Sequence, residues 1–135
     1  CNDVMDHLPD HDAFLKSISK KIALNGTLIG SVPNVRYYFV LKDLLLHKEW
    51  RYVETGVLDS THLRFFTQRS LLRSLTEAGF VGITIQGINK VRYLRSLRKI
   101  PDYFLMFIIE VFSFGFHRDI RFRQFAFRSA RKGVA

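Results

Sequence analysis

A helix followed at once by a short apolar strand, over residues 10–34, is the feature that most constrains how this chain can fold. Apolar residues recur every four positions from Phe14 to Ile22, which predicts a helix with one buried face. The run 27–32 is then mostly apolar, as in a strand that is buried on both faces of a parallel sheet, and Pro33 ends it. This order predicts the repeating unit of an open α/β sheet.

Polar side chains stand where the strands of this unit stop. Asn2, Asp3 and His7 follow the remnant of a first strand, and Asn34 follows the strand over 27–32. Ligands of open α/β sheets bind beyond the carboxyl ends of the strands. These four residues are therefore the first candidates for a functional site.

The rest of the chain predicts further helices and strands. They are a helix over 36–50, a loop over 51–60, a helix over 67–79, a strand over 80–88 and a last strand over 121–128. Thr67 is a good N-cap for its helix, from which we expect Leu71, Leu72 and Leu75 to face inward. Gly30, inside a strand, indicates that another group packs closely against the backbone.

The composition is that of one packed globular domain. The chain has 135 residues, of which 47% are hydrophobic and 14% aromatic, and this excludes a disordered protein. A single cysteine, Cys1, excludes an internal disulfide framework and fits a reducing compartment, so we expect a cytoplasmic protein. The first residues show no signal peptide, and a chain that begins with Cys rather than Met is expected to be a fragment.

Residues 90–120 form a segment that is first basic and then rich in phenylalanine. Most of the net charge of +9 lies in the last third, because residues 90–135 hold eleven Lys and Arg against three Asp and Glu. The spacing predicts a helix over 90–99, and the apolar run 103–116 is too short to span a bilayer, which takes about 20 residues. Three interpretations stay open: a solvated helix over the core, attachment to an anionic membrane surface, and nucleic-acid binding, which is disfavoured because no recognition motif is present.

The histidines do not predict a metal site. The chain has five of them, at His7, His11, His47, His62 and His117, and although His7 and His11 have the His-x₃-His spacing, no His-Glu-x₂-His motif is present. One cysteine cannot build a zinc cluster, and neither a Gly-x-Ser-x-Gly elbow nor a P-loop is present. From spacing alone we expect no metal.

Four stretches, in this order, resemble the class I S-adenosylmethionine-dependent methyltransferases of types 11, 12 and 23. They are NDVMDHLPD at residues 2–10, LNGTLIGSVPN at 24–34, THLRFFT at 61–67 with EAGF at 77–80, and QFAFRSARK at 124–132. The chain departs from the family pattern at Asp6, where Glu is usual, and at Asn25, where Gly or Pro is usual. The subgroup that comes closest is found beside enzymes of glycan, cell-surface polysaccharide and quinone biosynthesis.

The resemblance implies an α/β fold, a Rossmann-like methyltransferase sheet of which this chain holds the C-terminal half. Residues 1–135 would be a single partial domain, with the first strands and the glycine-rich loop before Cys1, because no Gly-x-Gly sequence follows it. The strand over 27–32 would run parallel to the remnant at 1–4. The strand over 121–128 would insert antiparallel between it and the strand at 81–87.

The resemblance also implies a cofactor site and an acceptor site at one rim of the sheet. Asn2 and Asp3 would lie beside S-adenosylmethionine, and His7 would face the reaction centre as a catalytic base. The residues that would bind the acceptor are Asn34, Arg36, Tyr37, Tyr38, His62 and Arg64. For each residue the alternative is a structural role within the fold, as a cap, a packed ring or a loop tether.

The function that follows from the resemblance is methyl transfer to a small-molecule or glycan-like acceptor. Because the glycine-rich loop is lacking, we expect this chain alone to bind the cofactor weakly and to be inactive. The alternative is a non-catalytic module, derived from a methyltransferase, that binds a partner or the surface of a membrane. An open sheet edge at residues 2–4 predicts a homodimer or a swapped assembly.

Overall fold

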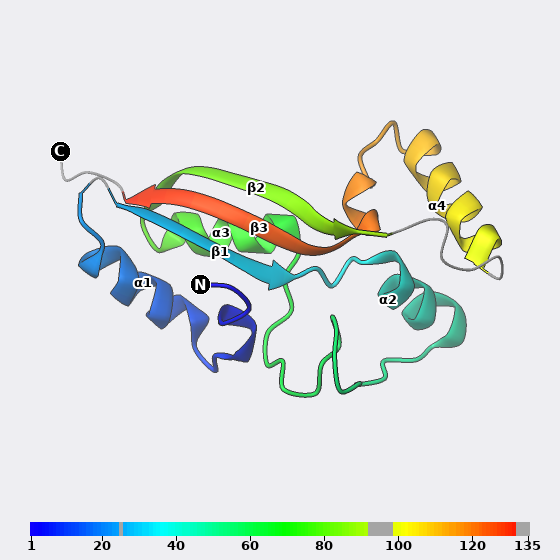
Figure 1. Ribbon diagram of the computed structural model, residues 1–135, viewed down its shortest axis with the longest axis horizontal. Helices are drawn as coiled ribbons and strands as arrows, with labels where there is room; N and C mark the ends of the chain where they lie inside the picture. The colour runs from blue at the N-terminus through cyan, green and yellow to red at the C-terminus, as the bar shows by residue number, and fades with distance from the viewer. Residues whose placement is uncertain (25, 92–98, 132–135) are drawn as a thin grey trace.

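The computed structural model describes residues 1–24, 26–91 and 99–131 and shows a twisted three-stranded sheet (Figure 1). Its strands are β1 (Thr27–Pro33), β2 (Phe80–Lys90) and β3 (Phe122–Arg131). Their order is β1-β3-β2, and β3 is antiparallel to both neighbours. The prediction that the last strand inserts antiparallel between the other two is confirmed.

The N-terminal residues run along the outer edge of β1. Asn2 forms a parallel bridge with Ser31, whose carbonyl accepts a hydrogen bond of 3.0 Å from the Asp3 amide. The Ser31 amide in turn donates to the carbonyl of Cys1 at 3.1 Å. The predicted parallel pairing is therefore present and places residues 2 and 3 near the carboxyl end of β1.

Gly30 lies where these N-terminal residues and β3 approach β1 most closely. A Cβ atom there would lie 2.7 Å from the ring of Phe127 and closer still to the carbonyl of Cys1. This confirms that glycine is present because of close packing.

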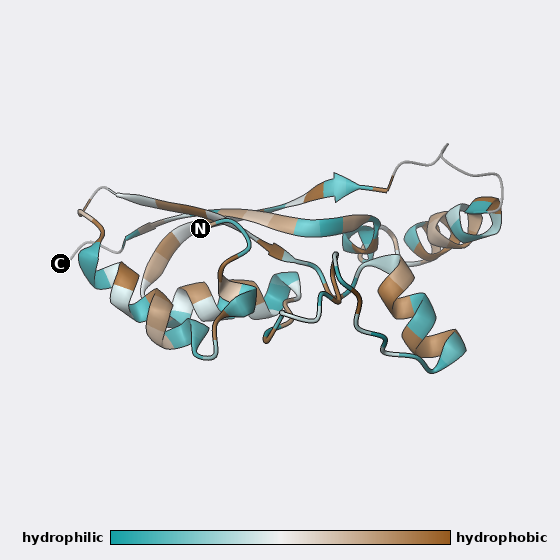
Figure 2. Cartoon of the chain, turned by 60° about the horizontal axis from the view of Figure 1, so that its bottom comes forward, coloured by the Kyte–Doolittle hydropathy of each residue, from teal (hydrophilic) through white to brown (hydrophobic). Residues whose placement is uncertain are grey.

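Helices α1 (His11–Lys21) and α3 (Gln68–Glu77) pack along the same face of the sheet (Figure 2). Asp10 caps α1 by accepting a 2.8 Å hydrogen bond from the Ala13 amide, and Thr67 caps α3 in a reciprocal capping box with Ser70. The core between the helices and the sheet is made of buried apolar side chains, which include Leu15, Leu28, Val32, Leu71, Leu75, Phe80, Phe125 and Phe127.

Two helix predictions need correction. Leu72 does not face inward: it is 45% exposed, whereas Leu71 and Leu75 are fully buried. A helix turns by about 100° per residue, so the side chain beside Leu71 is carried off the buried stripe. The helix predicted over 36–50 is shorter and consists of α2 (Tyr38–Lys42) and a π-helical turn, η2 (Asp43–His47).

The C-terminal segment packs beside α2 and forms a second, smaller hydrophobic core with it. It contains α4 (Ile100–Phe112) and a 3₁₀ turn, η4 (Arg118–Arg121), and its core joins Tyr38, Val91, Met106 and Ile120. The helix predicted over 90–99 lies mostly outside the described residues. Among the residues that are described, no helix has both the length and the apolar character to cross a bilayer.

Candidate functional site

A polar cleft of about 300 Å³ opens where β1 ends. Its lining includes Pro33 at the end of β1, Asp3 from the N-terminal segment, His62 from the loop before α3, and Arg123 and Gln124 from β3. Strands as well as loops therefore position its polar side chains. This cleft lies at the rim where the sequence predicted a functional site.

Asp3 is fixed firmly at this cleft. Its backbone is left-handed, with φ of +48°, a conformation that non-glycine residues adopt rarely and that is common at functional sites. The side-chain amide nitrogen of Gln124, Nε2, donates to both carboxylate oxygens of Asp3, at 3.0 and 2.9 Å. The Ser31 hydroxyl donates to Oδ1 at 3.1 Å. The carboxylate is thus preorganised by β1 and β3 together.

Asp6, one turn further along in the 3₁₀ helix η1 (Met5–His7), is a buried carboxylate between two imidazoles. The Nε2 atom of His62 lies 3.1 Å from Asp6 Oδ2, and the Nε2 atom of His7 lies 3.6 Å from the same oxygen. Burial raises the pKa of Asp6 above its ordinary value, although a backbone hydrogen bond and the two imidazoles oppose this shift.

Backbone hydrogen bonds hold the His62 loop against η1. The carbonyl of Asp6 accepts from the amides of Leu63 and Arg64, at 2.7 and 3.0 Å. The guanidinium of Arg64 also donates to the carbonyl of Pro9. Arg64 is therefore placed as a tether of this loop, and its predicted part in acceptor binding stays a prediction.

Asn34 and Arg36 are turned toward the C-terminal segment. Asn34 is fully buried, and its side-chain amide donates to the carbonyls of Asp119 and Phe122, each at 2.9 Å. The Nε atom of Arg36 lies 2.6 Å from Asp119 Oδ2, and its Nη2 lies 2.8 Å from His117 Nδ1. Both residues thus join the end of β1 to η4.

The two tyrosines lie beside α4. The hydroxyl of Tyr38 donates to Asp102 Oδ1 at 3.1 Å, and burial followed by this bond raises the pKa of Tyr38 to about 12. Burial also raises the pKa of Tyr37. An apolar cleft of about 360 Å³ opens between α2 and α4, with Arg36 and Tyr38 among its lining residues.

The structure thus divides the predicted site residues into two groups. Asp3 and His62 share the polar cleft, and the rings of His7 and His62 meet edge to face with centroids 4.8 Å apart. The other group, at the apolar cleft and η4, consists of Asn34, Arg36, Tyr37 and Tyr38. Asn2 is exposed at the edge of β1. Sequence reasoning missed Asp6, Arg123 and Gln124 as site residues, and only the Asp6-His7 dipeptide offered a signal for one of them.

The comparisons with known proteins concern the fold and the family. Residues 1–85 match a family model described as "Methyltransferase domain". The fold is similar to the crystal structure of a SAM dependent methyltransferase from Archaeoglobus fulgidus, with a TM-score of 0.62 and 16% sequence identity. The match covers 96% of this chain and 57% of that one, so the chain spans a little over half of its length. No curated protein sequence matches the chain. The predicted α/β methyltransferase fold is confirmed.

Proposed function

The chain belongs to the methyltransferase domain family, and on that premise we propose that it transfers the methyl group of S-adenosylmethionine to a small-molecule or glycan-like acceptor. The observation that carries this proposal is the shared cleft of Asp3 and His62 at the carboxyl end of β1. Positioning accounts for much of the rate of a methyl transfer, and both side chains are held in place by hydrogen bonds from separate elements.

The cleft suits one part of the cofactor. Asp3 and Arg123 carry opposite charges on its lining, which complements the ammonium and carboxylate groups of the methionine end of S-adenosylmethionine. Asp3 would hold the ammonium group, with the neighbouring Asn2 beside it. Among the described residues that line the cleft there is no Phe, Tyr or Trp ring on which adenine could stack. These residues therefore fit the amino-acid end of the cofactor, which supplies an electrophilic methyl group when bound.

His7 remains the candidate for accepting a proton from the acceptor. Its Nδ1 lies 3.2 Å from the carbonyl of Thr61, which can only accept a hydrogen bond, so Nδ1 carries a proton and in the neutral ring Nε2 carries a lone pair, 3.6 Å from Asp6 Oδ2. The side chain of His7 is 41% exposed, which leaves it accessible to an acceptor. For the acceptor itself, the apolar cleft beside Tyr38 offers room for an uncharged portion and two cations, Arg36 and Lys42, for a phosphate or hydroxyl.

Calorimetry with S-adenosylhomocysteine tests the proposal. We expect weak binding by this chain, tighter binding by the same chain joined to any residues that its gene encodes before Cys1, and loss of both in Asp3→Ala. The exposed Asp12→Ala variant is a control for the loss of a carboxylate. Absence of binding in every form would overturn the proposal.

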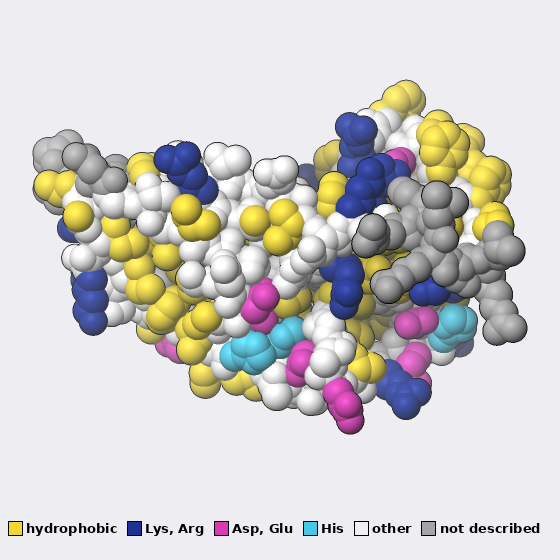
Figure 3. Space-filling view, in the orientation of Figure 1, with side chains coloured by type: hydrophobic (Ala, Val, Ile, Leu, Met, Phe, Trp, Pro, Cys, Tyr) yellow, Lys and Arg dark blue, Asp and Glu magenta, His cyan; other side chains and the backbone are white. Residues whose placement is uncertain are grey.

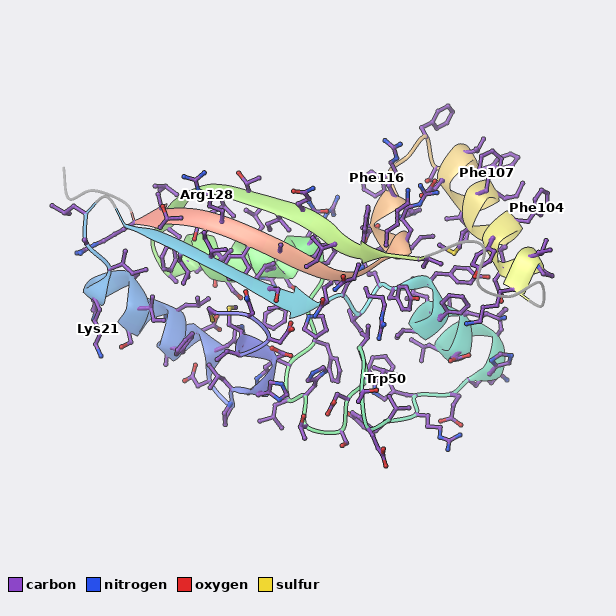
Figure 4. All side chains as sticks on the ribbon, viewed as in Figure 1. Lys21, Trp50, Phe104, Phe107, Phe116 and Arg128 are labelled. Atoms are coloured by element: carbon purple, nitrogen blue, oxygen red, sulfur yellow. The ribbon has the colours of Figure 1, made fainter. Side chains whose placement is uncertain are left out.

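A second candidate function, attachment to an anionic membrane surface, is favoured by the outer face of α4. Phe104, Phe107 and Phe112 are 65%, 56% and 76% exposed, and Figure 3 shows hydrophobic side chains gathered over this helix. Phe104 and Phe107 point away from the rest of the molecule in Figure 4. Lys and Arg side chains border this surface, as on segments that bind anionic lipid headgroups.

The acidic side chains of α4 do not oppose such attachment. Asp102 is paired with Lys42, 2.6 Å away, and Glu110 is paired with Arg121. Both carboxylates are therefore neutralised on the inner side of the helix. Flotation with vesicles that contain phosphatidylserine tests this candidate: we expect binding that falls with salt and is lost in Phe104→Ser/Phe107→Ser. Equal binding by that variant, or by neutral vesicles, would contradict it.

A further inference from the structure

The two histidines beside Asp6 share an orientation that a structural role alone does not require. His62 Nδ1 lies 3.0 Å from the carbonyl of Val57, and His7 Nδ1 lies 3.2 Å from the carbonyl of Thr61. A carbonyl can only accept, so each ring carries its proton on Nδ1. When the two rings are neutral, both Nε2 lone pairs therefore face Asp6. Metal-binding histidines are oriented in this way, by a hydrogen bond from the ring nitrogen that does not bind the metal.

Besides the two imidazoles, no described side chain donates a hydrogen bond to the carboxylate of Asp6. Its side chain is fully buried, and apart from its own backbone amide no described residue donates a hydrogen bond to either carboxylate oxygen. A proton on Asp6 could serve only one of the two imidazoles at a time. The 3.6 Å separation between Asp6 Oδ2 and His7 Nε2 is also too long for a hydrogen bond. The cluster is therefore incomplete as a hydrogen-bonded network.

Two of the three separations between these ligand atoms fit ligands of one metal ion, and the third, between the two imidazole nitrogens, is at most 4.8 Å. Two ligands at about 2.0–2.1 Å from a tetrahedral ion lie about 3.4 Å apart. The distances from Asp6 Oδ2 to His62 Nε2 and His7 Nε2, 3.1 and 3.6 Å, fall on either side of this value. One ligand atom from each of the three residues lies within 4.8 Å of the others. Two neutral imidazoles and one carboxylate are a usual donor set for zinc and its neighbours in the first transition row.

We propose that Asp6, His7 and His62 bind one divalent transition-metal ion of the zinc type. Asp6 and His62 would hold the ion from the buried side, and His7 would close the site from the exposed side. Three protein ligands leave a coordination position for water or an acceptor oxygen. His62 also lines the polar cleft, so the ion would lie beside the proposed methyl-transfer site.

This site gives His7 two exclusive roles. Its Nε2 lone pair can accept a proton or bind the ion, and while it binds the ion it cannot act as the base. An acceptor hydroxyl on the open position would then lose its proton more readily, because a bound cation lowers the pKa of the oxygen it holds. The inference does not depend on methyl transfer, since binding of the ion can be measured without cofactor or acceptor.

Metal titration tests the proposal. The protein should be prepared without a histidine tag and with Cys1→Ser, so that the terminal thiol does not bind the ion. We expect one Co²⁺ per chain with visible absorption bands of a four- or five-coordinate site, displaced by Zn²⁺ in calorimetry. Asp6→Asn, His7→Ala and His62→Ala should each weaken Zn²⁺ binding by about tenfold or more.

His47→Ala is the matched control, because His47 also pairs with a carboxylate, Asp43, at 3.0 Å but on an exposed surface. Its Zn²⁺ affinity should equal that of the parent. His7→Ala keeps the test valid if the buried variants fail to fold, because His7 is exposed. No stoichiometric Co²⁺ or Zn²⁺ binding by the parent, or unchanged affinity in a folded His7→Ala, would overturn the proposal, whatever the result with S-adenosylhomocysteine.

Discussion

Gln124 on β3 donates from one amide nitrogen to both carboxylate oxygens of Asp3, at 3.0 and 2.9 Å, although the two residues lie at opposite ends of the chain. The contact fastens the N-terminal segment to the strand at the centre of the sheet. It also holds Asp3 in its left-handed conformation at the cleft.

Replacing Gln124 by Ala should therefore loosen the N-terminal segment. We expect the free energy of unfolding to fall by about 1–3 kcal/mol, because a half-buried carboxylate loses its amide donor. Urea unfolding followed by circular dichroism measures the change, and the exposed Gln68→Ala variant provides the reference. Equal stability of the two variants would mean that Ser31 alone suffices to hold Asp3.

Gly30→Ala should destabilise the sheet by crowding. A Cβ atom at this position meets the Phe127 ring and the Cys1 carbonyl, and overpacking of this kind costs about 1–3 kcal/mol. Thermal unfolding gives the comparison with Ile29→Ala, a change at the neighbouring, 60% exposed position of the same strand. If both variants melt together, the close approach at Gly30 is not a constraint on stability.

Arg36 and Asp119 should be energetically coupled. Their 2.6 Å ion pair is largely shielded from solvent, so a double-mutant cycle with Arg36→Ala and Asp119→Ala should give a coupling of about 0.5–3 kcal/mol. The exposed pair of Asp43 and His47 should give less than about 0.5 kcal/mol in the same assay. Similar coupling in both pairs would contradict the assigned role of Arg36 in docking η4.

Tyr38 should ionise late. Its pKa of about 12, which arises from burial and from the hydrogen bond to Asp102, predicts that one tyrosine stays un-ionised well above pH 10. Absorbance at alkaline pH, measured as the difference between the parent and Tyr38→Phe, isolates this residue. Asp102→Asn should lower the midpoint, because the charge of Asp102 disfavours the phenolate.

The same shift predicts how stability depends on pH. The folded state holds the Tyr38 proton more tightly than the unfolded state, whose pKa is near 10, so the stabilising contribution is complete below pH 10. It is lost as the pH rises from about 10 to about 12. A Tyr38→Phe variant should lack this part of the pH dependence, and a parent whose stability is flat over this range would refute the assignment.

The sequence predicted correctly those helices and strands that a single local feature defines, such as the spacing of apolar residues or an N-cap. The four-residue spacing in α1, the Thr67 cap and the last strand, predicted over 121–128, each reflect a single element that buries one face, and each proved correct. Leu72 failed because an apolar residue beside a buried one need not be buried. The helix predicted over 36–50 was too long for a related reason. Its apolar spacing continues through η2, where the leucines are exposed and do not pack against the core.

The site depended on contacts that no local pattern records. His62 reaches Asp6 because the loop before α3 is hydrogen-bonded to η1, and spacing rules for metal ligands do not detect ligands that come from two separate segments. Arg123 and Gln124 reach the cleft only because β3 inserts beside β1. Likewise Asn34 and Arg36 face the C-terminal segment because η4 leads into the same strand.

The strand order also determines when this sheet can form during synthesis. Among the described strands, β1 and β2 have no hydrogen bonds to each other, and both pair only with β3, the last to leave the ribosome (Figure 1). Until residues 122–131 emerge, β1 and β2 lack the strand with which each of them pairs. This three-stranded sheet therefore depends on β3 to close, and stalling before β3 emerges would leave unpaired strand edges for chaperones or other chains to bind.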